Sequence, residues 1–175
     1  LAVGGASTRT FDLAVADGWT LLARDGRVVQ ETPEIGWWLL VRWLARELHG
    51  QRRWLGVLHA ATIAMPFGTL ALAGGSGAGK TTLAGAMVAA GGTLLADDAT
   101  AIDAAGQAWP CPVAMSVKEG SWPLFTAMFE GFGAATAPLR LGAKTVRYFP
   151  LPAPTLPTEG RKLAAIVLPC WRAGA

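Results

Sequence analysis

The segment from Gly74 to Thr81 constrains the fold more than any other part of the chain. It reads Gly-Gly-Ser-Gly-Ala-Gly-Lys-Thr and matches the phosphate-binding pattern G-x-x-x-x-G-K-[ST] at every fixed position. An apolar run of strand type, Thr69 to Ala73, precedes it, and helix formers from Lys80 to Ala90 follow it. The order strand, glycine-rich loop, helix is therefore predicted.

This loop has the groups that a nucleotide phosphate site needs. Glycines let the backbone N–H groups point inward at phosphate oxygens, where larger side chains would block them. Lys80 would contact the β- and γ-phosphates, and the Thr81 hydroxyl would complete a Mg²⁺ shell. A glycine-rich turn that contains Lys-Thr by coincidence is the alternative, and the complete spacing argues against it. The predicted nucleotide-binding residues are Gly74, Gly75, Ser76, Gly77, Ala78, Gly79, Lys80, Thr81 and Thr82.

Composition narrows the classes of function that the chain can serve. The hydrophobic fraction is 52%, but His59, Lys80 and the arginines at 42 and 46 interrupt the longest apolar runs, so no membrane span is expected. The net charge of +3 comes without a concentrated block of basic residues, which argues against nucleic-acid binding. Cys111 and Cys170 have no metal or redox spacing and suit a reduced, cytoplasmic setting.

The whole chain, residues 1–175, is predicted to form one α/β domain. The chain begins at Leu1 rather than Met, so truncation at both ends is expected. Residues 1–57 are predicted to form antiparallel strands, separated by Asp-Gly turns, and then an amphipathic helix that opens at Thr32 and ends near His49. Residues 58–175 are predicted to form the nucleotide-binding core. Its further predicted elements are a strand from Leu58 to Met65, a hairpin with strands Ala99–Ile102 and Gln107–Trp109, a helix within Lys118–Phe129, an extended proline-rich segment from Phe149 to Pro157, and a last strand from Leu163 to Leu168.

Two adjacent carboxylates, Asp97 and Asp98, follow the predicted helix after a short apolar run. The helix carries the chain roughly 16 Å away from the loop. A returning strand of about five residues, at ~3.3 Å per residue, covers the same distance back. Both carboxylates should therefore lie beside the loop, at the carboxyl end of a strand parallel to Thr69–Ala73, where open α/β sheets bind ligands. One could hold Mg²⁺ and the other could accept a proton, whereas a turn or a helix cap is the structural alternative.

Three elements in fixed order resemble the HPr kinase/phosphorylase superfamily, especially its HPr-kinase-related branch of serine kinases. The first is Leu58-His59-Ala60, about fifteen residues before the loop, and the second is the loop itself. The third is the run from Gly91 to Asp98, where the family has a similar G-x-x-L-L-A-D-D. The short distance from loop to acidic pair is the discriminating detail, and the resemblance covers about His59 to Asp103.

The resemblance implies a Mg²⁺-dependent kinase that transfers phosphate from ATP to a seryl hydroxyl. It also implies a mixed sheet akin to the nucleotide domain of phosphoenolpyruvate carboxykinase. By the same resemblance, Asp97 is the proton acceptor, its neighbour Asp98 is associated with the metal, and His59 lies near the γ-phosphate. The predicted catalytic residues are therefore Asp97, Lys80 and His59, and the predicted metal ligands are Thr81 and Asp98. Relatives often form oligomers, so a homo-oligomer is a further expectation.

The sequence also departs from the family. The second signature of the bifunctional enzymes, an acidic residue in an Arg-Gly-rich segment, is absent, which argues against phosphorylase activity and against the carrier protein HPr as substrate. A peptide, another protein or a small hydroxyl compound is the expected acceptor. Lys118 is a further candidate for contact with phosphate or substrate, against the alternative of a solvated surface lysine. Arg147 is a candidate for stabilising the transferred charge, against the alternative of a surface salt bridge, and for Arg140 the salt bridge is the favoured interpretation. A nucleotide hydrolase and an inactive ATP-binding regulatory module are the alternative functions.

Overall fold

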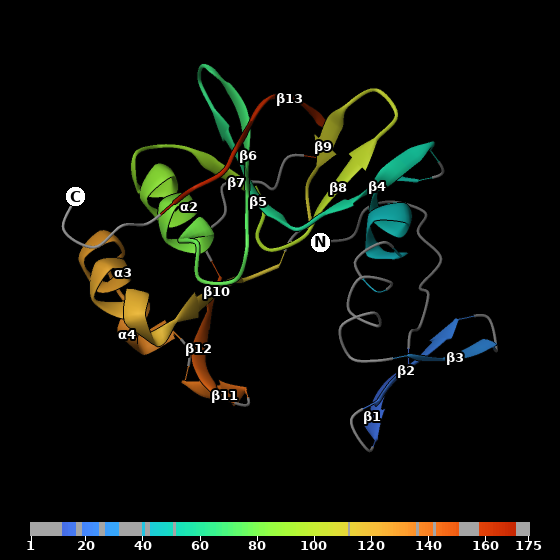
Figure 1. The fold of residues 1–175 in the computed structure, drawn as a ribbon, viewed down its shortest axis with the longest axis horizontal. Coiled ribbons are helices and arrows are strands. Elements are labelled where there is room, and N and C mark those ends of the chain that lie inside the picture. Colours follow the sequence, from blue (N-terminus) through green and yellow to red (C-terminus); the bar gives the residue numbers. More distant parts are fainter. Residues whose placement is uncertain are drawn as a thin grey trace.

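A computed structural model gives the fold, and it describes residues 12–16, 19–24, 27–31, 40, 43–50, 52–111, 113–135, 137–141, 143–150 and 158–170. Within these residues the protein is α/β, with one seven-stranded mixed sheet and two smaller antiparallel sheets (Figure 1). The predicted fold class is confirmed at this level. Antiparallel pairs dominate the large sheet, and its parallel pair joins its last strand in the sequence to the strand before the glycine-rich loop.

The seven-stranded sheet carries the loop near its middle. Its strands, in spatial order, are β4 (Trp54–Leu58), β8 (Thr100–Asp103), β9 (Gln107–Trp109), β13 (Arg161–Val167), β6 (Gly68–Ala73), β5 (Ala60–Met65) and β7 (Thr93–Ala96). β5 and β6 form a tight antiparallel hairpin in which Met65 pairs with Gly68. β6 then leads into the loop, and helix α2 (Lys80–Ala89) follows, as the sequence predicts.

The single predicted strand from Leu58 to Met65 is wrong, because the chain bends at His59. β4 ends at Leu58 and pairs with β8, whereas β5 begins at Ala60 and pairs with β6 and β7. An uninterrupted apolar run does not reveal that its two ends pair with different strands. The bend therefore places His59 at the point where the two parts of the sheet diverge.

The predicted hairpin between β8 and β9 is confirmed, and Asp103 fixes its turn. One carboxylate oxygen of Asp103 accepts hydrogen bonds from the backbone N–H groups of Ala105 (2.9 Å) and Gln107 (3.0 Å). The other accepts a hydrogen bond from the indole N–H of Trp109 at 2.8 Å. Burial favours the neutral acid, but these three donors outweigh it and lower the pKa of Asp103.

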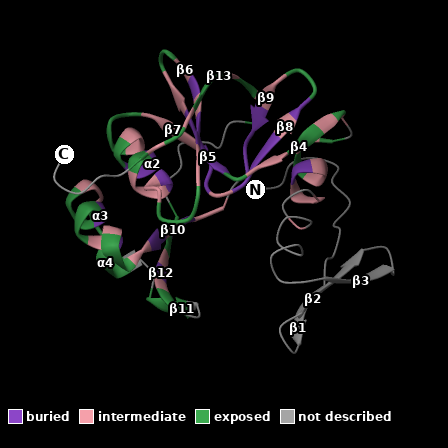
Figure 2. Ribbon diagram, viewed as in Figure 1, coloured by how far each residue is buried: buried purple, intermediate pink, exposed green. Residues whose placement is uncertain are grey.

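A second group of elements packs against α2 (Figures 1 and 2). It consists of β10 (Met115–Lys118), a 3₁₀ turn (Glu119–Ser121), α3 (Trp122–Met128), α4 (Phe132–Ala135), β11 (Leu139–Leu141) and β12 (Lys144–Phe149). Phe125 is fully buried, and a Cβ atom on Gly85 of α2 would lie only 2.6 Å from its ring. Glycine at position 85 therefore allows α2 and α3 to pack closely. The core cluster of this region is Ala61, Ile63, Leu72, Ala84, Met115, Val117, Phe125, Phe132 and Phe149.

The N-terminal strands are antiparallel, as predicted. β1 (Asp12–Ala16), β2 (Trp19–Arg24) and β3 (Arg27–Glu31) form a three-stranded meander. Residues 43–49 are helical, and Ala45 on this helix is buried against Ala101 and Trp109 of the large sheet. The end of the predicted helix is confirmed, while residues 32–39 and most of the proline-rich segment, 151–157, lie outside the described residues.

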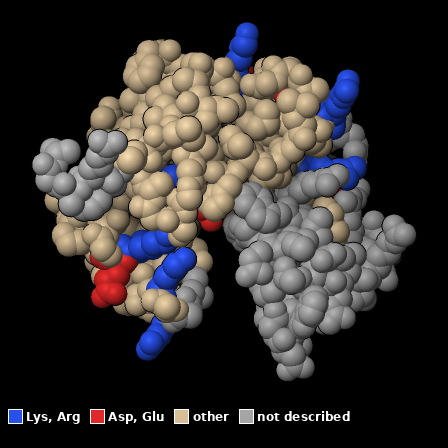
Figure 3. All heavy atoms as spheres, in the orientation of Figure 1, with Lys and Arg blue, Asp and Glu red and all other residues tan. Residues whose placement is uncertain are grey.

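No helix among the described residues is long and apolar enough to cross a bilayer. On the face drawn in Figure 3, lysine and arginine side chains gather over the end of the molecule that carries β11 and β12. Elsewhere on this face the basic side chains stand apart from one another.

Candidate functional site

A cavity of about 450 Å³ lies between the glycine-rich loop and one face of the β10–β12 sheet. This volume is in the range of small-molecule sites in proteins. Most of its lining residues carry a polar side chain, and they include three lysines and one carboxylate. The lining residues are His59, Ser76, Gly77, Gly79, Lys80, Thr81, Thr82, Asp98, Ser116, Lys118, Ser121, Lys144, Val146 and Tyr148.

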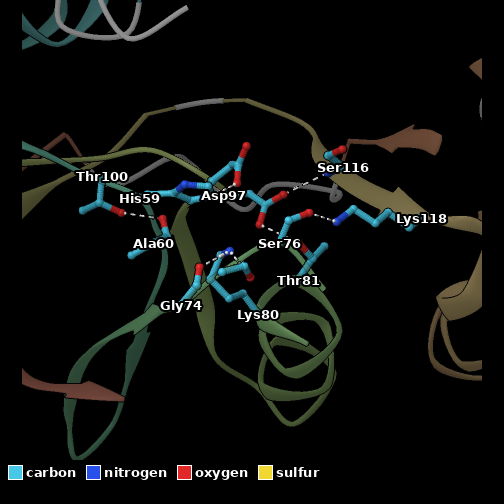
Figure 4. Close-up of polar contacts among 12 residues, drawn as sticks. His59, Ala60, Gly74, Ser76, Lys80, Thr81, Asp97, Thr100, Ser116 and Lys118 are labelled. Atoms are coloured by element: carbon cyan, nitrogen blue, oxygen red, sulfur yellow. Dashed lines mark hydrogen bonds and ion pairs between the residues drawn. The ribbon is translucent and has the colours of Figure 1, made fainter. Parts of the chain in front are cut away.

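The loop has the conformation that its glycines permit. Gly77 and Gly79 both adopt φ near 90°, a region that residues with a side chain rarely occupy. Lys80, the first residue of α2, folds back over the loop, and its Nζ donates hydrogen bonds to the carbonyl oxygens of Gly74 (2.7 Å) and Gly75 (3.2 Å) (Figure 4). The ammonium group and the N-terminus of α2 therefore give this end of the cavity a positive potential.

The structure brings Asp97 to the loop, as the helix and strand lengths predict. β7 runs antiparallel to β5, and β5 runs antiparallel to β6, so β7 and β6 point the same way with β5 between them. Asp97 follows β7 directly, and its carboxylate accepts hydrogen bonds from the Thr81 hydroxyl (3.3 Å) and the backbone N–H of Ser116 (2.9 Å) (Figure 4). Only 2% of Asp97 is exposed. Asp97 is thus a buried acid that is hydrogen-bonded to Thr81 at the start of α2.

Burial is the main influence on the acidity of Asp97. Burial raises the pKa of the carboxyl, and the nearby charge of Asp98 acts in the same sense, while hydrogen bonds from Ser116 and Thr81 and the charge of Lys80 oppose them. The net result is a pKa of about 6. The folded protein without a bound cation therefore takes up a proton at Asp97 more readily than the unfolded chain does.

This shift predicts a pH-dependent stability. Because the pKa is raised in the folded state, the free energy of unfolding should fall as pH rises from about 4 to about 6, by up to about 3 kcal/mol, and then stay level. The variant Asp97→Asn cannot ionise and should lack this component. Denaturant unfolding of both proteins in chelator between these pH values measures the difference. A stability difference that is the same at pH 4.5 and pH 7.5 would contradict the assignment.

Asp98 occupies a more open position and faces the cavity. Its Oδ1 atom lies 2.8 Å from Nε2 of His59, and the side chains of Asp98 and His59 are 49% and 47% exposed. Asp98 also has φ of 69°, a left-handed conformation that is uncommon for residues other than glycine. Such backbone strain collects at functional sites. The bend at His59 and the turn at Asp98 together bring an imidazole and an accessible carboxylate into contact.

The face of the β10–β12 sheet adds Lys144 and Tyr148 to the cavity, and no local sequence pattern distinguishes these two residues. Ser116 pairs with Tyr148 and Lys118 pairs with Val146, so with Lys144 these side chains share one face of the sheet. Lys118 was a candidate from the sequence, whereas Lys144 and Tyr148 were not. Arg147 points elsewhere: its guanidinium lies 4.8 Å from the centre of the Trp122 ring and donates to the carbonyl oxygen of Gly133.

The oxygen atoms of Thr81 and Asp97 suit a hard cation such as Mg²⁺. Magnesium prefers oxygen ligands and is commonly held by one or two carboxylates together with substrate phosphates. The described residues contain no group of three or more His, Cys, Asp and Glu side chains that could hold a metal ion. A metal at this place would therefore depend on ligands from the nucleotide.

No family model, no curated protein and no solved structure matches the chain. The assignment of a function therefore rests on the geometry of the site.

Proposed function

We propose that the protein is a Mg²⁺-dependent kinase that transfers the γ-phosphoryl group of ATP to a hydroxyl group, with serine in a peptide or protein as the first candidate. One observation carries the proposal: Lys80, Thr81 and Asp98 line one cavity at the edge of the sheet, and the buried Asp97 accepts a hydrogen bond from Thr81 beside them. Phosphoryl transfer needs alignment and neutralisation of charge more than covalent chemistry, and these groups supply both.

The loop and its lysine would bind the nucleotide. Backbone N–H groups of the loop and of the first turn of α2 would bind the β- and γ-phosphates, and Lys80 would exchange its loop carbonyls for phosphate oxygens. Thr81 and Asp97 would hold Mg²⁺, which would neutralise the phosphates and the charge that develops during transfer. Asp97 would then be ionised, because a nearby cation favours the carboxylate.

The resemblance implies that Asp97 accepts the proton and that Asp98 is associated with the metal. The contacts of the two carboxylates favour the opposite assignment. Asp97 is buried and bonded to Thr81, which suits the metal-side acid. Asp98 lines the cavity and is about half exposed, which suits the proton acceptor. A base must be within hydrogen-bond reach of the hydroxyl whose proton it takes, and Asp98 can be reached from the cavity. The Nε2–H group of His59 would hold its carboxylate in place.

The oxygen of the acceptor hydroxyl forms a bond to the γ-phosphorus, and the bond between that phosphorus and the β,γ-bridging oxygen breaks. ADP leaves with the electron pair of the broken bond, and the hydroxyl proton passes to Asp98. Lys80 stays on the phosphates through the step, where its charge stabilises the departing oxygen.

Two other functions use the same cavity. In a nucleotide hydrolase, water would replace the acceptor hydroxyl, and in a regulatory module ATP would bind without turnover. The solvent-accessible contact between Asp98 and His59 favours the kinase over the regulatory module, because a binding module needs no proton acceptor.

Cys111 and Cys170 are both free thiols, which suits the cytoplasm as the proposed compartment.

Transfer of label from γ-labelled ATP tests the proposal. The protein is incubated with Mg²⁺ and with host proteins, peptides and small molecules as separate fractions, and Asp98→Asn is the matched control. We expect label in one of these fractions with the unmutated protein alone. Label released only as inorganic phosphate would support the hydrolase, and ATP binding without any turnover would support the regulatory module.

A further inference from the structure

The wall of the cavity opposite Lys80 is a second basic surface. β12 pairs antiparallel with β10, so Lys118 lies opposite Val146, and Lys144 lies two residues before Val146 on the same face. Both lysines line the cavity. They come from segments far from the loop in the sequence, and the pairing of β10 with β12 brings them together.

Both lysine side chains reach the tip of the glycine-rich loop. Nζ of Lys118 donates a hydrogen bond to the hydroxyl oxygen of Ser76 at 2.8 Å, and Nζ of Lys144 approaches the same oxygen at 3.4 Å (Figure 4 for Lys118). Ser76 follows Gly75, whose carbonyl oxygen accepts a hydrogen bond from Lys80. Lys80 therefore contacts the loop at Gly74 and Gly75, and Lys118 and Lys144 contact it at the next residue, Ser76.

Three ammonium groups around one loop repel one another. Burial lowers the pKa of Lys118, and the charges of Lys144 and Lys80 lower it further, while Asp98 opposes this. A serine hydroxyl is neutral and cannot offset these charges. A ligand with several negative charges can, since each of its oxygens accepts a charge-assisted hydrogen bond. The terminal phosphate of a nucleoside triphosphate has three such oxygens.

We propose that Lys118 and Lys144 bind the terminal phosphate of ATP and so make the site select the triphosphate over the diphosphate. This inference rests on the proposed function. With Lys80 at the base of the loop and the pair at its tip, the γ-phosphate would be held from two sides. After transfer this phosphate belongs to the acceptor, so ADP loses the contact with the pair and is released more easily.

The affinity for ATP and ADP, measured by calorimetry with Mg²⁺, tests this assignment. The variants are Lys118→Met and Lys144→Met, and the matched control is Lys162→Met on β13, an exposed lysine that does not line the cavity. We expect each pocket variant to weaken ATP binding about tenfold, with less than about threefold change for ADP. The control should leave both affinities unchanged. Thermal unfolding of each variant confirms that it folds.

The outcomes separate the two proposals. If the unmutated protein binds neither nucleotide, the proposed function itself fails. If it binds both, and the pocket variants weaken ATP and ADP equally or not at all, only the assignment of Lys118 and Lys144 is overturned. Lys118→Arg, which keeps the charge, should retain most of the preference for ATP, and its failure to do so despite normal folding would also contradict the assignment.

Discussion

Replacing Asp98 by Asn should lower the rate of phosphoryl transfer by about 10²–10⁴-fold, the usual contribution of a positioned general base. The affinity for ATP should change by less than about threefold, since Asp98 would touch the acceptor rather than the nucleotide. The substitution suits the site because Asn tolerates the left-handed backbone that position 98 adopts, with φ of 69°. Single-turnover transfer and equilibrium binding of ATP measure the two effects separately.

Asp97→Asn is the control that distinguishes the two carboxylates. This variant should raise the Mg²⁺ concentration needed for half-maximal activity, because Asp97 contacts Thr81 beside the loop. Asp98→Asn should leave that concentration unchanged. If instead Asp98→Asn shifts the Mg²⁺ requirement while Asp97→Asn removes transfer at saturating Mg²⁺, the roles implied by the family resemblance are the right ones.

Replacing Lys80 by Ala should weaken both nucleotide binding and turnover. Lys80 is 7% exposed, and its ammonium group already lies against the loop carbonyls where phosphate would bind. Loss of a charge-assisted contact that is shielded from water costs about 1.5–3 kcal/mol, roughly 10- to 150-fold in ATP affinity. Further loss should appear in turnover, because the lysine also stabilises charge in the transition state.

The same calorimetric titration checks this expectation, with Lys162→Ala on β13 as the control for loss of one positive charge. A Lys80→Ala protein that folds and binds ATP as tightly as the unmutated protein would place the nucleotide elsewhere. Loss of binding in Lys162→Ala to the same extent would show that net charge alone governs affinity.

The part of the site that the sequence predicts is the part built from consecutive residues. The loop, its lysine and α2 follow from the spacing of Gly74, Gly79 and Lys80, since this part of the backbone is built from neighbouring residues and both glycines adopt a positive φ. The position of Asp97 follows from helix rise and strand rise, because only one helix and one strand separate it from the loop.

The remaining part of the site depends on contacts between distant segments. The bend at His59 exists because β4 and β5 pair with different strands. Lys144 reaches the cavity because β12 pairs with β10 in one register, and a shift by one residue would turn its side chain to the other face. The contact of Asp97 with the backbone N–H of Ser116 likewise joins two segments that lie 19 residues apart in the sequence. Such pairings between distant strands cannot be predicted from a short stretch of sequence.

A crystal structure of the protein with Mg²⁺ and a non-hydrolysable ATP analogue tests the central claim most directly. We expect the β- and γ-phosphates to lie in the glycine-rich loop against Lys80, with the metal at Thr81 and Asp97 and with Asp98 facing the γ-phosphate from the acceptor side. A nucleotide bound outside this cavity, or a loop that stays closed on Lys80 with phosphates elsewhere, would contradict it.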